Sequence, residues 1–341
     1  MKGRTVVLGN WRGREAAALL VDGSLEDLLV AGDAPAPGTI YRALPDRPLK
    51  GLGGIFVRTP DGMGFLRQAK GVAPGKPLLV QVTGYAEPGK AFPVTARVMV
   101  KSRYAIATPG APGVNVSRRI RDAERRDALQ ALAEAAGGAG AEPGLILRSS
   151  CEDAEDEEIA ADIASVLDVA RKILSDTGPA PETLLAGDGP HALAWREWTE
   201  PARLEQGPES FAEAGVLDAL DALGGPELAL PGGARMTVEA TRALVAVDVD
   251  TGADGSPAAG LKANLAAAQA LPRALRLRGL GGQIVMDPAP MPRKDRPKLD
   301  AALRAAFRRD PVETSLVGWT PLGHVELQRQ RARPPLESLR P

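Results

Sequence analysis

The chain has 341 residues, of which 44% are hydrophobic and 25% are charged, proportions typical of soluble globular proteins. This length allows two or three modest hydrophobic cores, so we expect several subdomains. The 38 glycines and 30 prolines indicate many loops. A formal net charge of −1 excludes a uniformly cationic protein, so any binding of nucleic acid requires local clusters of lysine and arginine.

The single cysteine, Cys151, excludes an internal disulfide framework and a zinc site made from paired thiolates. No window resembles a signal peptide or an uninterrupted apolar span of about 20 residues. We therefore expect a cytoplasmic protein without a membrane partner.

The first third of the chain has the pattern of short strands. Residues 5–9 and 16–21 are apolar, and Asp22 with Gly23 predicts a hairpin turn. From Gly38 to Pro109, glycine and proline separate short apolar runs, which predicts a small barrel of about five strands, most naturally of the OB type. The clearest strand candidates there are residues 55–58, 64–66, 78–85 and 96–100.

The middle third is mainly helical in pattern. An alanine-rich polar stretch predicts a helix over residues 122–136, and a short strand is expected at 145–147. Residues 177–210 are expected to be irregular. Apolar residues at helical spacing predict an amphipathic helix, its apolar face consisting of Ile159, Ile163, Val166, Leu167, Ala170 and Leu174.

The last third alternates between strand and helix, an order that predicts an α/β layer. We expect helices at 259–277 and 297–309. The expected strands are residues 242–249, 283–287, 314–319 and 325–327.

Two carboxylates, Asp248 and Asp250, lie two residues apart at a strand end, and strand alternation places both on one face. Such a pair repels unless a cation lies between its members, so it favours Mg²⁺. Asp287 ends the next apolar strand, and the three carboxylates converge if the two strands are neighbours. Alternatively, Asp248 and Asp250 cap the turn into Gly252, and Asp287 starts a turn before Pro288.

The residues after the acidic pair contain four motifs in a fixed order. They are NLAAA at 264–268, LRLRGLGG at 275–282, IVMD at 284–287 and GHVELQRQR at 323–331. This series resembles the signature of the ribonuclease E/G family, in which N-L-x-A-A, L-R-L-R-x-L-G-G, I-V-x-D and G-x-x-E-x-x-R-Q-R follow an acidic strand end.

The resemblance implies that Asp248 and Asp287 bind the metal and that Asp250 is a third catalytic position, where the family usually has asparagine. It implies an Mg²⁺-dependent endoribonuclease that cleaves single-stranded RNA in RNA processing or decay. The metal would activate water for attack on the phosphodiester, which leaves 5′-phosphate and 3′-hydroxyl ends.

The resemblance covers most of the chain and implies an α/β fold of several subdomains. An RNase H-like piece would combine residues 1–37 with a shortened part at 161–232. An S1-type OB barrel at 38–110 and a sensor region at 111–160 would be inserted into it. A DNase I-like α/β catalytic subdomain would follow at 233–341.

Phe56 and Phe65 match the aromatic positions of the barrel that contact RNA. Bases stack on aromatic faces with about 1–3 kcal/mol each, independently of sequence. Alternatively, the two phenylalanines belong to the barrel core. Arg118 and Arg119, in SRRI at 117–120, match the family's motif after the barrel and suit phosphate contacts. Their alternative role is an exposed helix start.

Arg148 and Ser149 occupy the arginine and threonine places of the family's 5′-monophosphate sensor. The acidic run EDAEDEE at 152–158 would repel a phosphate there, unless it only favours a helix N-terminus. Glu313 falls near the place of a third sensor arginine. We therefore expect no preference for 5′-phosphorylated RNA.

Other departures from the family pattern concern Ala266, which replaces a glutamate, and Pro290, which replaces an aspartate. Pro341 is reached before the family's C-P-x-C zinc-link motif, so we expect any homodimer to form without a zinc link. The two histidines, His191 and His324, lack partners at ligand spacing and are expected to be structural or at the surface.

Three cations after Asp287, namely Arg293, Lys294 and Arg296, suit the backbone of a substrate or the start of a solvated helix. Two functions compete with an endoribonuclease. One is a catalytically weak or inactive RNA-binding member of the family. The other is a metal-dependent phosphodiesterase that acts on DNA or a small molecule, which the RNA-type aromatics of the barrel disfavour.

Overall fold

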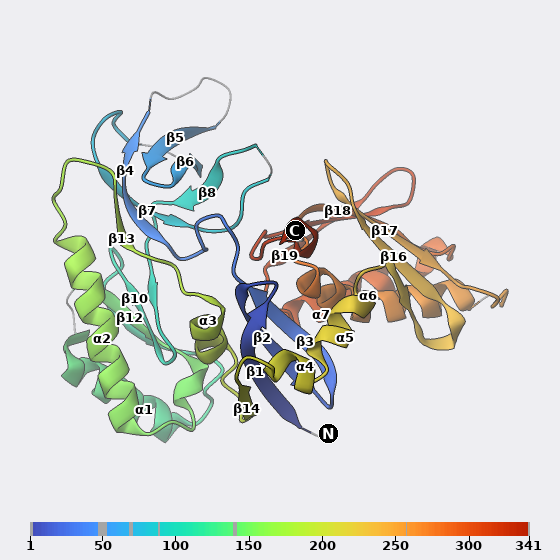
Figure 1. The fold of residues 1–341 in the computed structure, drawn as a ribbon, viewed down its shortest axis with the longest axis horizontal. Helices are drawn as coiled ribbons and strands as arrows, with labels where there is room; N and C mark the ends of the chain where they lie inside the picture. Colours follow the sequence, from blue (N-terminus) through green and yellow to red (C-terminus); the bar gives the residue numbers. More distant parts are fainter. Residues whose placement is uncertain are drawn as a thin grey trace. The chain divides into compact units, whose positions relative to one another are not determined.

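The computed structural model describes residues 3–46, 53–67, 71–87, 89–138, 142–256 and 258–339. The chain divides into two compact units (Figure 1). The first unit combines Met1–Gly32 with Ala202–Pro341, and the second consists of Asp33–Pro201.

The first unit contains a small sheet built on an N-terminal meander. Its four strands, in the order β14-β1-β2-β3, are β1 (Arg4–Trp11), β2 (Arg14–Val21), β3 (Ser24–Val30) and β14 (Arg203–Gln206). The predicted turn at Asp22 and Gly23 is confirmed, and both residues have positive φ. Helices α4 (Ser210–Glu213) and α5 (Val216–Ala222) pack on this sheet. A Cβ atom at Gly9 would lie 2.7 Å from the Ser210 Oγ, so glycine permits this close approach.

The first unit also contains a six-stranded sheet, in the order β15-β16-β17-β18-β20-β19. Its strands are β15 (Glu227–Ala229), β16 (Arg235–Ala240), β17 (Val245–Asp250), β18 (Gly282–Asp287), β19 (Thr314–Trp319) and β20 (Val325–Arg329). Helices α6 (Ala259–Leu277) and α7 (Arg296–Arg309) cover one face (Figure 1). β17 and β18 are parallel, and α6 forms the crossover between them.

Burial alternates along these strands and distinguishes the two faces of the sheet. Val247, Val249, Ile284 and Met286 are buried beneath the helices. The intervening positions, such as Asp248, are exposed or partly buried on the opposite face. We call that opposite face, on the side of the sheet away from α6 and α7, the open face.

The second unit contains the five-stranded barrel that the sequence predicts. Its strands are β4 (Ile40–Pro45), β5 (Gly54–Thr59), β6 (Gly62–Arg67), β7 (Leu78–Val82) and β8 (Phe92–Thr95). They follow the order β4-β5-β6-β8-β7, and the pairing of β4 with β7 closes the barrel. Tyr41, Ile55, Val57, Val80 and Val94 lie in its core. The prediction of a strand at 96–100 was wrong, because the residues that pair with β6 and β7 are Phe92–Thr95.

The rest of the second unit is a four-stranded sheet covered by helices. Its strands are β9 (Val100–Lys101), β10 (Ala105–Thr108), β11 (Val114–Val116) and β12 (Gly144–Leu147). Helices α1 (Ala123–Ala133), extended by a π-helical turn at Glu134–Gly138, and α2 (Asp156–Leu174) pack in its core, and the unit also contains α3 (Pro190–Glu197). The predicted apolar face of α2 lies in this core, except for Leu174, which is exposed.

Two further expectations need correction. Residues 177–210 are not irregular, because they contain β13 (Glu182–Leu185), which pairs with β4, as well as α3 and β14. The strand expected at 242–249 begins only at Val245, because the Thr241 side chain and backbone bind Leu244 in a turn.

The mixed α/β fold with a closed barrel agrees with the predicted class, while the RNase H-like and DNase I-like layout stays a prediction. β1 and β14 pair in parallel, which joins two parts of the predicted RNase H-like piece. Residues 161–201 of that piece belong to the second unit. Within the described ranges, no helix combines the length and apolarity that a membrane crossing requires.

A buried ion network in the first unit joins the N-terminal meander to the six-stranded sheet. Arg276 on α6 donates to Asp27 on β3 at 3.2 Å, to Glu26 at 2.6 Å and to Asp310 after α7. Arg329 on β20 donates to Asp310 at 3.0 Å. Arg276, Asp27, Asp310 and Arg329 are all almost fully buried, so each charge depends on its partners for stabilisation.

Replacing Arg276 should destabilise the first unit strongly. Arg276→Met leaves the Asp27 and Asp310 carboxylates with fewer partners in the interior, and we expect a loss of roughly 3–5 kcal/mol in the free energy of unfolding, measured by urea denaturation. The control is Lys262→Met on the same helix, which removes an exposed cation. Its loss should stay below about 1 kcal/mol. Equal losses would contradict the role of the network.

The same network predicts a pH dependence of stability. Burial acts to raise the pKa of Asp27, but the guanidinium groups of Arg333 and Arg276 outweigh it, so this pKa lies below the ordinary value of 3.8. A lowered pKa stabilises the folded state above pH 3.8, and this contribution is lost as the pH falls through the folded-state pKa.

The measurement compares wild type with Asp27→Asn by urea denaturation from about pH 6 to about pH 2. Wild type should be the more stable protein at the upper end, and the difference should shrink below pH 3.8. A difference that stays constant with pH would contradict the assignment.

Candidate metal and RNA site

The parallel pairing of β17 with β18 places Asp248 directly across from Asp287. Neighbouring strands lie about 4.8 Å apart, so the two carboxylates are adjacent. Both side chains are exposed on the open face, because the residues next to them in each strand, Val247, Val249 and Met286, point into the helical core. The predicted neighbourhood of the two strands is therefore confirmed.

Asp250 shares the open face with Asp248 but is engaged differently. Its Oδ1 accepts a hydrogen bond from the Gly252 backbone and lies 3.8 Å from the Arg235 guanidinium. The turn-capping alternative thus holds for Asp250. Within the described residues, no group of three His, Cys, Asp or Glu side chains is arranged to hold a metal, so the expected convergence of three carboxylates is not found.

His324 is a site residue that the sequence did not reveal. It precedes β20, whose Val325 pairs with Met286, and its Nε2 lies 3.7 Å from the Asp287 Oδ1. Sequence patterns do not connect the two residues, because they are 37 positions apart and the contact depends on the antiparallel pairing of β18 with β20. His324 thus borders the carboxylate pair.

The donor set fits Mg²⁺. This ion is usually held by one or two carboxylates, keeps several waters and takes further oxygens from phosphates. Asp248 and Asp287 supply two carboxylates on an exposed surface that leaves room for water and substrate. Asp287 is 62% exposed, and the neighbouring imidazole of His324 still leaves its second oxygen open to a ligand.

Asn264 fixes the loop that follows Asp287. It is fully buried on α6, and its side-chain amide donates to the Ala289 carbonyl and accepts from the Ala289 N–H, both at 2.9 Å. A Cβ atom at Gly260 would lie 1.9 Å from the Pro290 carbonyl oxygen, so the loop packs closely against the helix. The asparagine of the NLAAA motif therefore has a structural role beside the carboxylate pair.

Phe56 and Phe65 form a pair on the outer surface of the barrel. They lie opposite each other on β5 and β6, with ring centroids 5.2 Å apart and planes inclined by 59°. Both are only partly buried and lie outside the barrel core, so the core alternative was wrong. A Cβ atom at Gly54 would lie 2.6 Å from the Phe65 Cζ, so a glycine makes room for this ring.

Two cations follow the aromatic pair on the same outer surface. Arg58 lies two positions after Phe56, and Arg67 lies two positions after Phe65, so both share the face of the rings. Arg58 is 56% exposed and only loosely paired with Asp46, at 3.5 Å. The barrel thus combines aromatic faces with positive charge, as binding of single-stranded nucleic acid requires.

Arg118 and Arg119 lie in a tight turn and not at a helix start. The Ile120 N–H binds the Ser117 carbonyl, and the Arg126 guanidinium donates to the Ser117 and Ile120 carbonyls, which fixes the turn. Both side chains of the pair are exposed, and the described residues offer them no carboxylate partner. They stay available for phosphate contacts.

Arg148 is already engaged. It donates to the Glu197 carboxylate at 2.6 Å and to the Ser102 carbonyl at 2.6 Å. Burial acts to raise the pKa of Glu197, but the guanidinium groups of Arg148 and Arg196 outweigh it, and the pKa is lowered. Glu197 is therefore a carboxylate that competes with any phosphate for Arg148. Ser149 is partly buried at the start of a short 3₁₀ turn.

The acidic run at 152–158 leads into the N-terminus of a helix, as the alternative interpretation of the sequence predicted. Asp156, Glu157 and Glu158 form the first turn of α2, where negative charge is favourable. Arg125 pairs with Asp156 at 2.7 Å, and the Tyr104 hydroxyl donates to Glu158 at 2.9 Å. These contacts partly compensate the charge of the run.

The cations after Asp287 belong to a helix start. Arg293–Asp295 is a 3₁₀ turn that leads into α7, and the Arg296 guanidinium lies 4.3 Å from the centre of the Trp319 ring. Lys294 is exposed. The helix-start alternative is thus confirmed, and a substrate contact of these residues stays a prediction.

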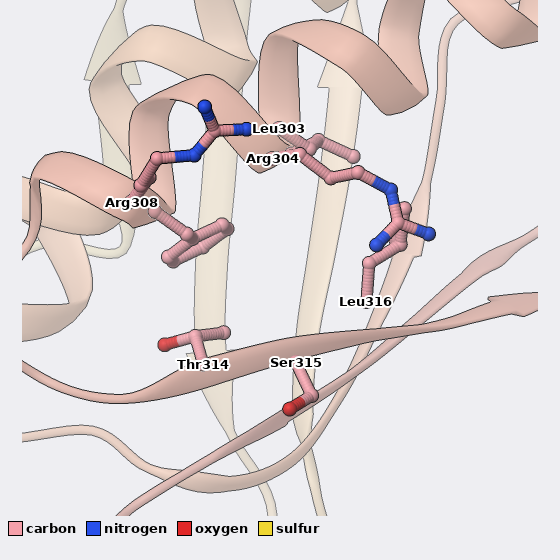
Figure 2. A pocket seen from close by; sticks show the side chains of 7 residues that line it. Leu303, Arg304, Arg308, Thr314, Ser315 and Leu316 are labelled. Atoms are coloured by element: carbon pink, nitrogen blue, oxygen red, sulfur yellow. The ribbon is translucent and has the colours of Figure 1, made fainter.

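A cavity of about 460 Å³ lies between α7 and the edge strand β19. Figure 2 shows the Arg304 and Arg308 guanidinium groups on the helix side and Thr314 on the strand across from them. Thr314 pairs with Arg329, which pairs with Gly282 at the opposite end of β18 from Asp287. Arg308 also lies in the last turn of α7, where a cation offsets the helix dipole. The cavity is therefore separate from the carboxylate pair.

Comparison with known proteins adds to this geometry. The sequence model described as "Ribonuclease E/G family" matches residues 99–201 and 195–332, which include both carboxylates of the pair. The chain belongs to the ribonuclease E/G family. The matched stretches begin after Phe56 and Phe65, so the family assignment does not depend on the barrel.

Several curated ribonucleases of this family are similar to the chain. Ribonuclease G of Salmonella typhimurium (strain SL1344) is 30% identical over 306 residues, which cover 78% of this chain and 62% of that protein. Ribonuclease E of Nostoc sp. (strain PCC 7120 / SAG 25.82 / UTEX 2576) is 28% identical over 379 residues, covering 93% and 54%. Ribonuclease G of Escherichia coli (strain K12) is 30% identical, covering 78% and 62%. The chain thus spans less than two thirds of the length of these relatives.

Proposed function

We propose that the chain is an Mg²⁺-dependent endoribonuclease that cleaves single-stranded RNA and leaves 5′-phosphate and 3′-hydroxyl ends. The observation that carries this proposal is the placement of Asp248 across from Asp287 on the open face, in a member of the ribonuclease E/G family. The partly exposed Phe56–Phe65 pair supports RNA as the substrate.

The proposed chemistry is hydrolysis of the bond between phosphorus and the 3′ oxygen. Mg²⁺, when bound, would neutralise the negative charge that develops on the phosphate and would lower the pKa of the attacking water. Asp248 and Asp287 would hold the ion, and parallel strand pairing fixes the spacing of their backbones. Asn264 holds the loop after Asp287 in place through Ala289. Arg235 lies close enough to Asp250 to offset its negative charge.

Cleavage of a fluorescent single-stranded RNA, with and without Mg²⁺, tests the proposal. Asp287→Asn and Asp248→Asn should each lower the cleavage rate by about 10²-fold or more, because one of the two metal carboxylates loses its charge. Both side chains are exposed, so the variants should fold.

The matched control is Glu239→Gln, an exposed carboxylate on the neighbouring strand β16 of the same sheet. Its cleavage rate should equal that of wild type. Metal-independent cleavage by wild type, or full activity of Asp287→Asn, would contradict the proposal.

A second candidate function is an RNA-binding protein without efficient turnover. The lack of a three-residue metal cluster among the described residues, and the engagement of Asp250 by Gly252, favour it. The same assay separates the two candidates. Tight binding of RNA without Mg²⁺-dependent cleavage, even at high protein concentration, would support this candidate in place of the enzyme.

The Arg148–Glu197 pair predicts how the enzyme treats RNA 5′ ends. Wild type should cleave 5′-phosphorylated and 5′-hydroxyl RNA at similar rates, because Glu197 already neutralises Arg148. Glu197→Gln removes that charge and should produce a several-fold preference for the 5′-phosphate, because a charge-assisted contact becomes available. Glu200→Gln serves as control. A strong preference in wild type would show that a phosphate displaces Glu197.

A further inference from the structure

Trp195 presents a large aromatic surface to solvent on the second unit. It lies on α3 and is 67% exposed. Among the large exposed hydrophobic side chains of the described ranges, it is the one aromatic residue. Most of this residue does not pack against the core of the unit. Its exposed surface is therefore a candidate for contact with a ligand.

Arg103 holds this ring in a defined orientation. Its guanidinium carbon lies 4.1 Å from the centre of the Trp195 ring, and its Nη1 donates to the Trp195 carbonyl oxygen. The centre of the Tyr104 ring lies 5.7 Å from the same guanidinium carbon. The guanidinium therefore contacts two rings, while Trp195 stays 67% exposed. The indole is pre-positioned to accept a second planar group.

Several cations lie near this ring, and most of them already have carboxylate partners. Arg148 and Arg196 share the carboxylate of Glu197, and Arg196 also pairs with Asp188. In the described part of the chain, no carboxylate forms an ion pair with Arg103, whose Nε is buried without a hydrogen-bond partner.

Lys101 adds a further cation. Desolvation and the nearby guanidinium groups of Arg196 and Arg148 lower its pKa, although Glu197 acts in the opposite direction. Two carboxylates of α2 in this region are already engaged. Glu158 accepts from the Tyr104 hydroxyl, and Asp162 accepts from the Ser102 hydroxyl and the Tyr104 N–H. An anionic ligand would therefore gain from contact with Lys101 and Arg103.

An exposed aromatic face beside cations is the combination that single-stranded nucleic acids recognise. The base stacks on the ring, and the adjoining phosphates contact the cations. Tryptophan and arginine also occur at the centres of protein interfaces. A protein interface, however, usually contains further large apolar side chains, and the other exposed ones among the described residues of the second unit, Met63 and Leu174, are each only 38% exposed. The surroundings favour a nucleic acid.

We propose that Trp195 is a stacking surface for an unpaired RNA base, backed by Arg103 and separate from the Phe56–Phe65 pair. The inference rests on the proposed function, since it takes RNA as the ligand. The second unit would then have two aromatic surfaces that contact RNA, one on the barrel and one on α3.

The test is binding of a short single-stranded RNA to the full chain in EDTA, where binding is separated from cleavage. Trp195→Ala should raise the Kd roughly 5- to 100-fold, as expected for loss of one stacked base. Trp195→Phe keeps a ring and should raise it less than about fivefold. The control is Leu217→Ala, a 38% exposed apolar side chain on α5 of the first unit, which should leave the Kd unchanged.

Tryptophan fluorescence gives a second readout that needs no loss of affinity. RNA should quench the emission of wild type, and Trp195→Ala should lose most of that quenching, because Trp195 is the most exposed of the four tryptophans. Trp11 is buried, and Trp198 and Trp319 are only partly exposed. Arg103→Gln should reduce the slope of log Kd against log salt by about 0.7, the value for one phosphate contact on a single strand. If Trp195→Ala does not fold, the test rests on two other measurements. RNA should still quench the fluorescence of wild type, and Trp195→Phe should lose most of that quenching while it keeps most of the affinity.

The outcomes separate the two proposals. If Phe56→Ala weakens binding but Trp195→Ala does not, and quenching persists without Trp195, the stacking inference is wrong while RNA binding stands. If wild type binds no RNA at all, both proposals are overturned. Weakened binding together with lost quenching in Trp195→Ala supports the inference.

Discussion

The first unit depends on a small set of buried charges. Arg276 reaches from α6 to Asp27 on the N-terminal meander and to Asp310 beyond α7, and Arg329 on β20 shares Asp310. Such charges are stable in the interior only when all their partners are in place, so the two sheets of the unit must assemble together. Arg276 and Arg329 belong to the LRLR and RQR motifs, so part of the family signature records a requirement of the fold and not of the chemistry.

The carboxylate pair follows from that framework. Because α6 is the crossover between parallel strands, it fixes the order of β17 and β18 and, with it, the register of Asp248 and Asp287. The same helix presents Asn264 to the loop after Asp287. One helix thus connects the ion network at its C-terminal half with the site at its N-terminal half.

Local patterns predicted the elements that depend on short-range order. The helix at 259–277 was correct at both ends, because its apolar periodicity is strong and glycine follows its end. The hairpin turn at Asp22 and the barrel were also predictable. β16 was missed because its residues look like a loop beside Gly232 and Gly233, and the order within 177–210 depends on pairing with distant strands.

For the site, alternation within one strand correctly placed Asp248 and Asp250 on one face. It did not reveal that Gly252 and Arg235 engage Asp250, because those contacts come from a turn and from the neighbouring strand. His324 beside Asp287 and Glu197 beside Arg148 were equally inaccessible, since both contacts join segments far apart in the chain. Sequence patterns identify candidate groups, whereas tertiary pairing decides which groups are already occupied.

The parallel register of Asp248 and Asp287 has an evolutionary consequence. Main-chain hydrogen bonding sets the positions of the two backbones, and neither carboxylate contributes to a hydrophobic core. Two like charges at this spacing oppose folding, so a neutral residue at either position is tolerated by the fold. A lineage can therefore lose the proposed reaction through one base change and keep an intact protein, whereas loss of Arg276 destabilises the fold itself. We therefore expect relatives that keep this architecture but have lost the proposed RNA cleavage.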